Sequence, residues 1–213
     1  MSNSIKLYVI LCCLFCTIIV TGNLIFQKFI ILDLYFFSPI EISVGVFLYP
    51  ITFLISDLVS EFYGEELAKL MIRSGVICSL MVLLVIIVAD QMPATKWSII
   101  DKETFHRVFS AFGISSLASI LANYIGQLVD IHIFLKLKLW TRERHLWLRN
   151  NVSTIIGQII DTFTVISILY VASIIPEGEY FKIIYSSLIF KIIAALLDTP
   201  FCYLGHYLMN KLT

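Results

Sequence analysis

The sequence predicts an all-α integral membrane protein, a polytopic bundle of about six transmembrane helices. Its 213 residues are 59% hydrophobic and only 14% charged, and the mean hydropathy is +0.93. These values lie well outside the range of water-soluble domains of this size. Basic and acidic residues number 15 each, so the zero net charge indicates neither a nucleic-acid surface nor a strongly acidic partner.

Six apolar segments are long enough to cross a hydrocarbon core of about 30 Å, which takes about 20 helical residues. They cover residues 7–26, 40–62, 67–89, 108–134, 152–175 and 181–209. The first segment is longer than the core of a signal peptide and no clear small-x-small cleavage site follows it, so we expect it to be retained. Because the links are short, we expect residues 1–213 to form a single transmembrane domain.

Lysine and arginine in the short links set the expected orientation, because cytoplasmic links carry an excess of both. The most basic link joins the fourth and fifth segments and holds Lys136, Lys138, Arg142, Arg144 and Arg149. Placing this link in the cytoplasm makes both chain termini cytoplasmic. Two roles are open for this link. Its basic residues only set the orientation in the membrane and contact anionic lipid headgroups, or the link forms a gate or a docking surface for a cytoplasmic partner.

Ionisable side chains at membrane depth are costly unless they pair or face a wet cavity, so each is a candidate functional residue. Four stand out in the apolar segments: Asp57, Asp161, Lys191 and Asp198. Lys191 and Asp198 are seven residues apart, which places them on one face of the last segment. Thr199-Pro200 follows at once, where proline removes a backbone donor.

The fourth and fifth segments carry similar polar faces. Asn123, Gln127 and Asp130 have offsets of zero, four and seven, and Thr154, Gln158 and Asp161 repeat those offsets. The strings 126–130 (GQLVD) and 157–161 (GQIID) nearly match. These groups either hold the helices together, with Gly126 and Gly157 allowing close approach, or line a substrate chamber, which is the interpretation we favour.

Motifs for bond-breaking chemistry are missing from the sequence. It has no metal-ligand cluster, Gly-x-Ser-x-Gly elbow or Gly-rich phosphate loop, and its four histidines are scattered. We therefore expect no catalytic residue, no metal and no cofactor, and a protein that is not an enzyme. Carboxylates and carboxamides suit recognition of a flat, donor-rich solute, because one carboxylate accepts from two neighbouring N–H groups.

Several stretches match a known family over nearly the whole chain. They are Asn23 with Lys28, the string 49–53 (YPITF) with Asp57, Glu61, Tyr63 and Gly64, then Tyr124, Gln127 and Asp130, the string 147–151 (WLRNN), Ser153-Thr154, Gln158 and Asp161, and finally Lys191, Thr199-Pro200 and Tyr203. On these residues the chain resembles the queuosine precursor transporters, the YhhQ-like or putative vitamin uptake group.

The resemblance implies a multi-pass carrier of the cell inner membrane that imports 7-deazaguanine bases, queuine or its precursors, for salvage into tRNA modification without direct contact with nucleic acid. The expected substrate-binding residues are Asn23, Asp57, Asn123, Gln127, Asp130, Gln158, Asp161, Lys191 and Asp198. In this interpretation Asp161 or Asp130 holds the base edge, and Asp57 or Asp198 is the counter-ion of an aminomethyl group.

Three questions stay open at the sequence level: which precursor is preferred, whether transport is proton-coupled, and whether the chain forms homo-oligomers. The alternative function is that of a substrate-binding subunit of an energy-coupling-factor importer for another small polar solute. Such a subunit needs a separate ATPase partner, because the chain carries no nucleotide-binding motif.

Overall fold

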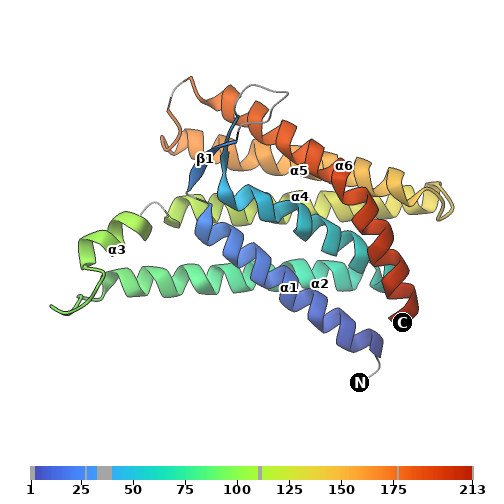
Figure 1. Cartoon of the computed structure of the whole chain (residues 1–213), viewed down its shortest axis with the longest axis horizontal. Helices are drawn as coiled ribbons and strands as arrows, with labels where there is room; N and C mark the ends of the chain where they lie inside the picture. The colour runs from blue at the N-terminus through green and yellow to red at the C-terminus, as the bar shows by residue number, and fades with distance from the viewer. Residues whose placement is uncertain (1–2, 27, 33–39, 110–111, 177, 213) are drawn as a thin grey trace.

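Long helices dominate the computed structural model, which describes residues 3–26, 28–32, 40–109, 112–176 and 178–212 (Figure 1). The elements are α1 (Asn3–Ile25), β1 (Phe29–Leu32), β2 (Ile40–Ser43), the 3-10 helix η1 (Val44–Leu48), α2 (Tyr49–Gln91), α3 (Lys102–Phe109), α4 (Phe112–Trp140), α5 (Leu146–Val171) and α6 (Tyr180–Leu212). Within the described residues, five helices are long and apolar enough to cross a membrane. The chain is therefore an all-α, multi-pass membrane bundle, as predicted.

Residues 49–62 of the predicted second segment and the whole of the third lie in α2, which reverses its direction at Gly64 (Figure 1). Gly64 has φ 81° and ψ 178°, a conformation that is essentially restricted to glycine. Both arms of α2 run along α1, in opposite directions. The contacts with α1 are Tyr49 to Asn23 and Tyr63 to Ser4 for the first arm, and Leu67 to Tyr8 and Ser79 to Asn23 for the second.

Several boundaries differ from the sequence prediction: residues 44–48 form a 3-10 helix, α4 begins at Phe112 after the separate helix α3, and α5 ends at Val171. Residues 40–43 form the strand β2, paired antiparallel with β1, instead of the start of a helix, because β-branched isoleucines alternate there with polar residues. Helix α4 continues to Trp140, so Lys136 and Lys138 are helical rather than part of a link. Helix α5 begins at Leu146 rather than at residue 152, which places Arg149 within a helix.

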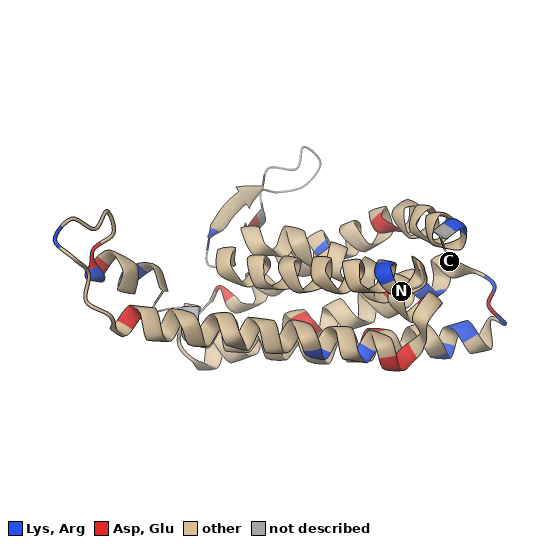
Figure 2. Cartoon of the chain, turned by 90° about the horizontal axis from the view of Figure 1, so that it is seen from below, with Lys and Arg blue, Asp and Glu red and all other residues tan. Residues whose placement is uncertain are grey.

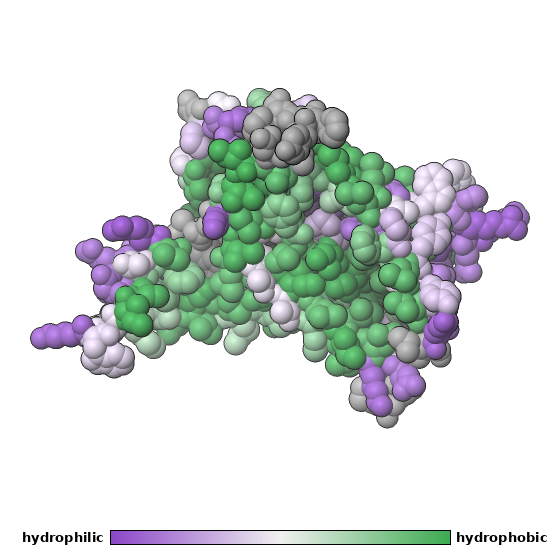
Figure 3. All heavy atoms as spheres, viewed as in Figure 1, coloured by the Kyte–Doolittle hydropathy of each residue, from purple (hydrophilic) through white to green (hydrophobic). Residues whose placement is uncertain are grey.

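Charge and hydropathy divide the molecule along its long axis. Lysine, arginine, aspartate and glutamate gather toward the two ends (Figure 2), and apolar atoms cover the middle of the visible face (Figure 3). Both termini lie at the end that also holds residues 141–145, between α4 and α5. We call this the link end and the opposite end, where β1 and β2 lie, the hairpin end.

Replacing Gly64 by alanine should lower the stability of the protein by about 1–3 kcal/mol, because an L-residue is strained at this φ and ψ. A Cβ atom there would meet open space, so the effect would come from the backbone and not from a clash. Thermal unfolding in detergent measures it. Gly113→Ala, also in open space but without a positive φ, is the control. Equal unfolding temperatures for the two variants would contradict this account of the turn.

Candidate functional site

The polar interior is organised around one close helix crossing, where α4 meets α5 at Gly126 and Gly157. A Cβ atom on Gly126 would lie 2.8 Å from the carbonyl oxygen of Gly157, and a Cβ atom on Gly157 would lie 2.8 Å from the carbonyl oxygen of Gly126. Asp161 packs beside Gly126, and Asp130 packs beside Gly157. The predicted close approach is confirmed, and the near-repeat places one aspartate on each side of the crossing.

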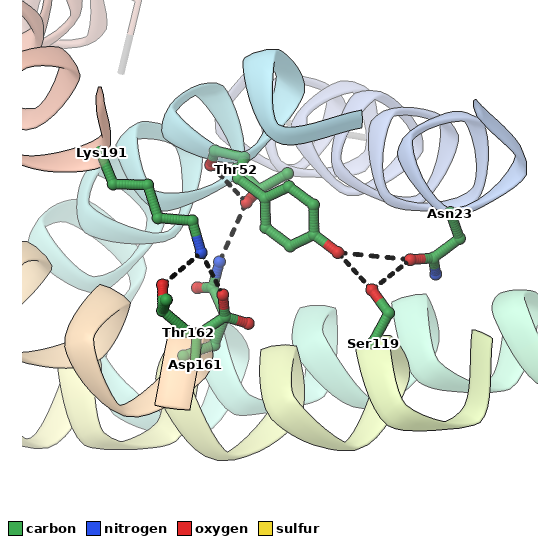
Figure 4. Close-up of polar contacts among 8 residues, drawn as sticks. Asn23, Thr52, Ser119, Asp161, Thr162 and Lys191 are labelled. Atoms are coloured by element: carbon green, nitrogen blue, oxygen red, sulfur yellow. Dashed lines mark hydrogen bonds and ion pairs between the residues drawn. The ribbon is translucent and has the colours of Figure 1, made fainter. Parts of the chain in front are cut away.

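The first polar level lies toward the hairpin end and contains a buried ion pair. Lys191 on α6 donates to the carboxylate of Asp161 and, at 2.9 Å, to Oγ1 of Thr162 (Figure 4). Lys191 is 3% exposed and Asp161 is 2% exposed. The ammonium also lies 5.2 Å from the centre of the Tyr49 ring, a distance at which an aromatic face attracts a cation.

A hydroxyl network extends this level to α1 and α4. Ser119 donates to Oδ1 of Asn23 at 2.7 Å (Figure 4), and the Tyr49 hydroxyl bonds to Ser119 and donates to the same Asn23 oxygen at 3.4 Å. Close by on α2, Thr52 accepts a hydrogen bond from Nε2 of Gln127 at 3.1 Å. Tyr49 therefore joins the ion pair on one side to Asn23 on the other.

The second polar level is a pair of aspartates that lie side by side, Asp57 on α2 and Asp130 on α4. Asp57 is 1% exposed and Asp130 is fully buried. Thr154 donates to Oδ2 of Asp57 at 3.4 Å. Within the described residues, Oδ1 of Asp57 and both carboxylate oxygens of Asp130 have no hydrogen-bond partner.

The third polar level, toward the link end, is an ionic cluster. Arg149 donates to Oε1 of Glu61 at 2.7 Å, and its guanidinium lies 5.3 Å from the centre of the Phe134 ring. Lys138 donates to the backbone oxygen of Glu61 at 3.0 Å and pairs with its carboxylate at 3.3 Å. Arg149 is 1% exposed, so this residue of the predicted basic link is an interior ion-pair partner.

The three levels follow one another along the bundle. Tyr49, Asp57 and Glu61 succeed each other on the first arm of α2, at about 1.5 Å of helix rise per residue. Helix α4 passes the same levels in one direction, and α5 passes them in the other. A solute that crossed the bundle beside these residues would meet an ion pair, a carboxyl pair and an ionic cluster in turn.

A small cavity opens beside the first level. Its volume is about 30 Å³, and its polar lining residues are Ser43, Tyr49, Asp161, Thr162, Ser187 and Lys191. A wider pocket of about 400 Å³ lies further toward the hairpin end. The two share five apolar lining residues: Phe26, Phe29, Leu169, Ile175 and Ile183. The cavity beside the ion pair and the wider pocket are therefore neighbours with a common apolar wall.

The structure brings some of the expected site residues together and leaves others apart. Asn23, Gln127, Asp161 and Lys191 belong to the first level, and Asp57 and Asp130 form the second. Asn123 and Gln158 are buried on α4 and α5, and Nδ2 of Asn123 and both amide atoms of Gln158 have no hydrogen-bond partner in the described part of the chain. Asp198 is only half-buried and does not share in the ion pair of Lys191.

Several residues of the three levels were absent from the expected site residues, among them Tyr49, Ser119, Thr162 and Arg149. Thr162 follows Asp161 directly, and its hydroxyl gives the Lys191 ammonium a second acceptor. Tyr49 lies in the string that carries the family resemblance, which was a usable signal. Arg149 also lies in such a string, 147–151, but was assigned to the basic link between the fourth and fifth segments, whereas the helix that buries it begins three residues earlier.

No three His, Cys, Asp or Glu side chains come together as a possible metal site in the portion of the chain that the structure describes. The groups that do converge are suited to binding a polar solute. Carboxylate, ammonium, amide and hydroxyl groups from five helical segments approach one another inside an apolar bundle, beside a cavity.

The sequence of most of the chain matches one known protein family. The sequence model of a family described as "Putative vitamin uptake transporter" matches residues 43–205. The chain belongs to this family. The match covers both arms of α2 and continues through most of α6, so it contains the residues of the three polar levels except Asn23 on α1.

Two curated proteins resemble this family member. The "Probable queuosine precursor transporter" of Bacillus subtilis (strain 168) is 25% identical over 162 residues, which are 76% of this chain and 70% of the relative. The "Queuosine precursor transporter" of Escherichia coli (strain K12) is 30% identical over 118 residues, 55% of this chain and half of the relative. No solved structure matches the chain significantly. Neither name describes an ATPase-dependent subunit, so the alternative function is not favoured.

Replacing Gly126 by alanine should destabilise the crossing of α4 and α5 by about 1–3 kcal/mol, the usual cost of overpacking. The added Cβ atom would lie 2.8 Å from a backbone oxygen, so a helix would have to move. Gly113→Ala on the same helix adds an identical methyl group in open space. Thermal unfolding should separate the two variants, and equal stabilities would show that the helices do not meet at Gly126.

Removing the cation of the first level should cost about 3–5 kcal/mol of stability, because Lys191→Met leaves a buried carboxylate without its counter-ion. The double variant Lys191→Met, Asp161→Asn should recover most of that loss, since no buried charge remains unpaired. Unfolding of the two single variants and the double variant completes the thermodynamic cycle. Additive effects would mean that the two side chains do not interact.

Proposed function

We propose that this member of the vitamin uptake transporter family imports 7-deazaguanine bases that serve as queuosine precursors. The observation on which the proposal depends most is the buried Asp161–Lys191 pair on the wall of the cavity. The names of the two curated relatives supply the substrate class. The imported base would then be salvaged for tRNA modification in the cytoplasm.

The chemistry of the first level matches the edge of a guanine-like base. Such a base presents a ring N–H and an exocyclic amine side by side, and a carbonyl oxygen next to them. The Asp161 carboxylate can accept from both donors, and the Lys191 ammonium can donate to the carbonyl. The Tyr49 ring lies beside both side chains and offers an aromatic face to a flat solute.

Unpartnered amides add to this set. Oε1 of Gln127 and both amide atoms of Gln158 are buried without a hydrogen-bond partner within the described residues. Buried polar groups normally have hydrogen-bond partners, so these amide atoms are suited to bind the remaining donors and acceptors of a base. Asn123, with its vacant Nδ2, is a further candidate, and Asn23 holds Tyr49 and Ser119 in place.

The cavity, with a volume of about 30 Å³, has room for about two or three water molecules and is too small for a bicyclic base. Binding therefore requires the apolar side chains between the cavity and the wider pocket to move apart. The ionic cluster of the third level would keep the link end closed meanwhile. This arrangement fits a carrier in which the two ends open in alternation around a central site.

The proposal includes an orientation and a location. The chain would lie in the cell inner membrane with its termini and residues 141–145 in the cytoplasm, because the basic residues favour that side. The hairpin end, with its wider pocket, would then face the outside and receive the base. The link end would release it.

Expression in a bacterium that can neither make nor import queuosine precursors tests the proposal. Queuine and its precursors are supplied singly at low concentration, and queuosine in tRNA is measured. Modification should depend on the intact chain. Asp161→Asn should slow uptake about 10- to 100-fold, the equivalent of one charge-assisted hydrogen bond, and Gln158→Ala should act in the same direction.

Asp90→Asn is the matched control, because Asp90 pairs with His106 at the hairpin end of α2, away from the polar levels. It should leave modification unchanged. If no base restores queuosine although the protein reaches the membrane, the chain does not transport these bases. If Asp161→Asn transports as well as the control, the base does not bind at the first level.

A further inference from the structure

The buried acids and cations of the bundle do not balance. Asp161 is matched by Lys191, and Glu61 is matched by Arg149 and Lys138. Asp57 and Asp130 then remain as two adjacent carboxyl groups, 1% and 0% exposed. Burying one uncompensated charge in a membrane interior is costly, and two carboxylates in contact cannot both stay ionised.

The hydrogen bonds around Asp130 also indicate that the two carboxyl groups are not both ionised. Three hydroxyl groups lie beside its carboxyl group, those of Ser56, Ser153 and Thr154. Each donates its proton elsewhere: Ser56 to the Phe53 carbonyl oxygen at 2.8 Å, Ser153 to that of Asn150 at 3.3 Å, and Thr154 to Asp57 at 3.4 Å. Among the described residues, neither oxygen of Asp130 receives a hydrogen bond. The missing donor is explained if one of the two carboxyl groups is protonated and donates a hydrogen bond to the other.

The near-repeat provides an internal comparison. Asp130 and Asp161 occupy equivalent places in the strings 126–130 and 157–161, and each packs beside the glycine of the other helix. Asp161 meets an ammonium from α6, whereas Asp130 meets the carboxyl group of Asp57 from α2. Equivalent positions thus face an ammonium group on one side of the crossing and a second carboxyl group on the other.

We propose that Asp57 and Asp130 share one exchangeable proton and form the proton-coupling site of the carrier, which imports one proton with each base. This inference rests on the proposed function for its substrate. The proton enters from the hairpin side while that end is open, stays on the carboxyl pair during the change of conformation, and leaves to the cytoplasm when the link end opens.

The groups that face the pair supply the means of release. Arg149 on α5 and Cys202 on α6 lie near Asp57, and Glu61 on α2 lies next to both of these side chains. Nε and Nη1 of Arg149 have no hydrogen-bond partner among the described residues, while Nη2 is held by Glu61. Opening of the third level frees Arg149 from Glu61 and lets its guanidinium approach Asp57. A cation next to the pair favours its ionised form and expels the proton toward the link end.

Transport by the purified protein in lipid vesicles tests the coupling. With an outside pH one unit below the inside pH, one proton per base supports an accumulation of about tenfold, and a protonophore abolishes it. Asp130→Asn and Asp57→Asn should each lose this accumulation but still exchange labelled for unlabelled base without a gradient. Asp90→Asn, the matched control, should accumulate the base as the unmodified protein does.

Four results would overturn the inference. The first is accumulation by the unmodified protein that does not depend on the pH gradient, and the second is accumulation that survives in both aspartate variants. The third is an effect of the variants on aminomethyl bases alone, which would make the pair a counter-ion for the substrate. The fourth is that the two aspartate variants fold well but lose exchange as well as accumulation, which would likewise make the pair part of the substrate site.

Infrared spectroscopy keeps the inference separate from the proposed function. The detergent-solubilised protein near neutral pH should show a protonated carboxyl band that disappears in Asp130→Asn and in Asp57→Asn, but not in Asp90→Asn. If this band is present and no 7-deazaguanine base is transported, only the proposed substrate is wrong. If the unmodified protein transports the base and lacks the band, the proton site is wrong.

Discussion

Gly126 and Gly157 meet backbone to backbone where α4 crosses α5, and the positions of the polar groups follow from that contact. Membrane helices gain little from hydrophobic burial against one another, so close backbone approach and polar contacts decide where they pack. Side chains on either glycine would hold the helices apart. With glycine at both positions, Asp130 and Asp161 reach the interior on opposite sides of the crossing, each against the other helix.

Once the two aspartates are fixed, the surrounding helices determine their chemistry. Helix α6 supplies Lys191 to one of them, and the first arm of α2 supplies Asp57 to the other. That arm can pass close to the crossing because α2 turns back at Gly64, which leaves the second arm free to cover α1. Two helices with similar sequences thereby hold two unlike sites. Asp161 is paired with Lys191 beside the cavity, whereas Asp130 lies deeper in the bundle beside a second carboxyl group.

Much of this arrangement could be predicted from local sequence patterns, and its failures have physical causes. Helical offsets placed Gln127 and Asp130 on one face and Gln158 and Asp161 on another, and the glycines indicated contact between these faces. Offsets do not state which distant residue completes a contact, so the partnership of Lys191 with Asp161, 30 residues apart, was not predicted. The end of α4 and the start of α5 were misplaced because lysine and arginine are common both in basic links and at helix ends. Here the long side chains of Lys138 and Arg149 turn inward to Glu61.

The third level differs from the first two because it can act as a closure as well as a structural contact. Glu61 and Arg149 are nearly dehydrated and joined by a charge-assisted hydrogen bond, which is strong while water is excluded. Water that entered from the link end would hydrate both ions and weaken their attraction, since Coulomb interactions fall steeply as the local dielectric constant rises. The same hydration would lower the cost of ionising Asp57 and Asp130. Opening of the link end would therefore also change the charge of the carboxyl pair through the solvent, which would give a carrier a physical reason to keep an acid pair next to such a closure.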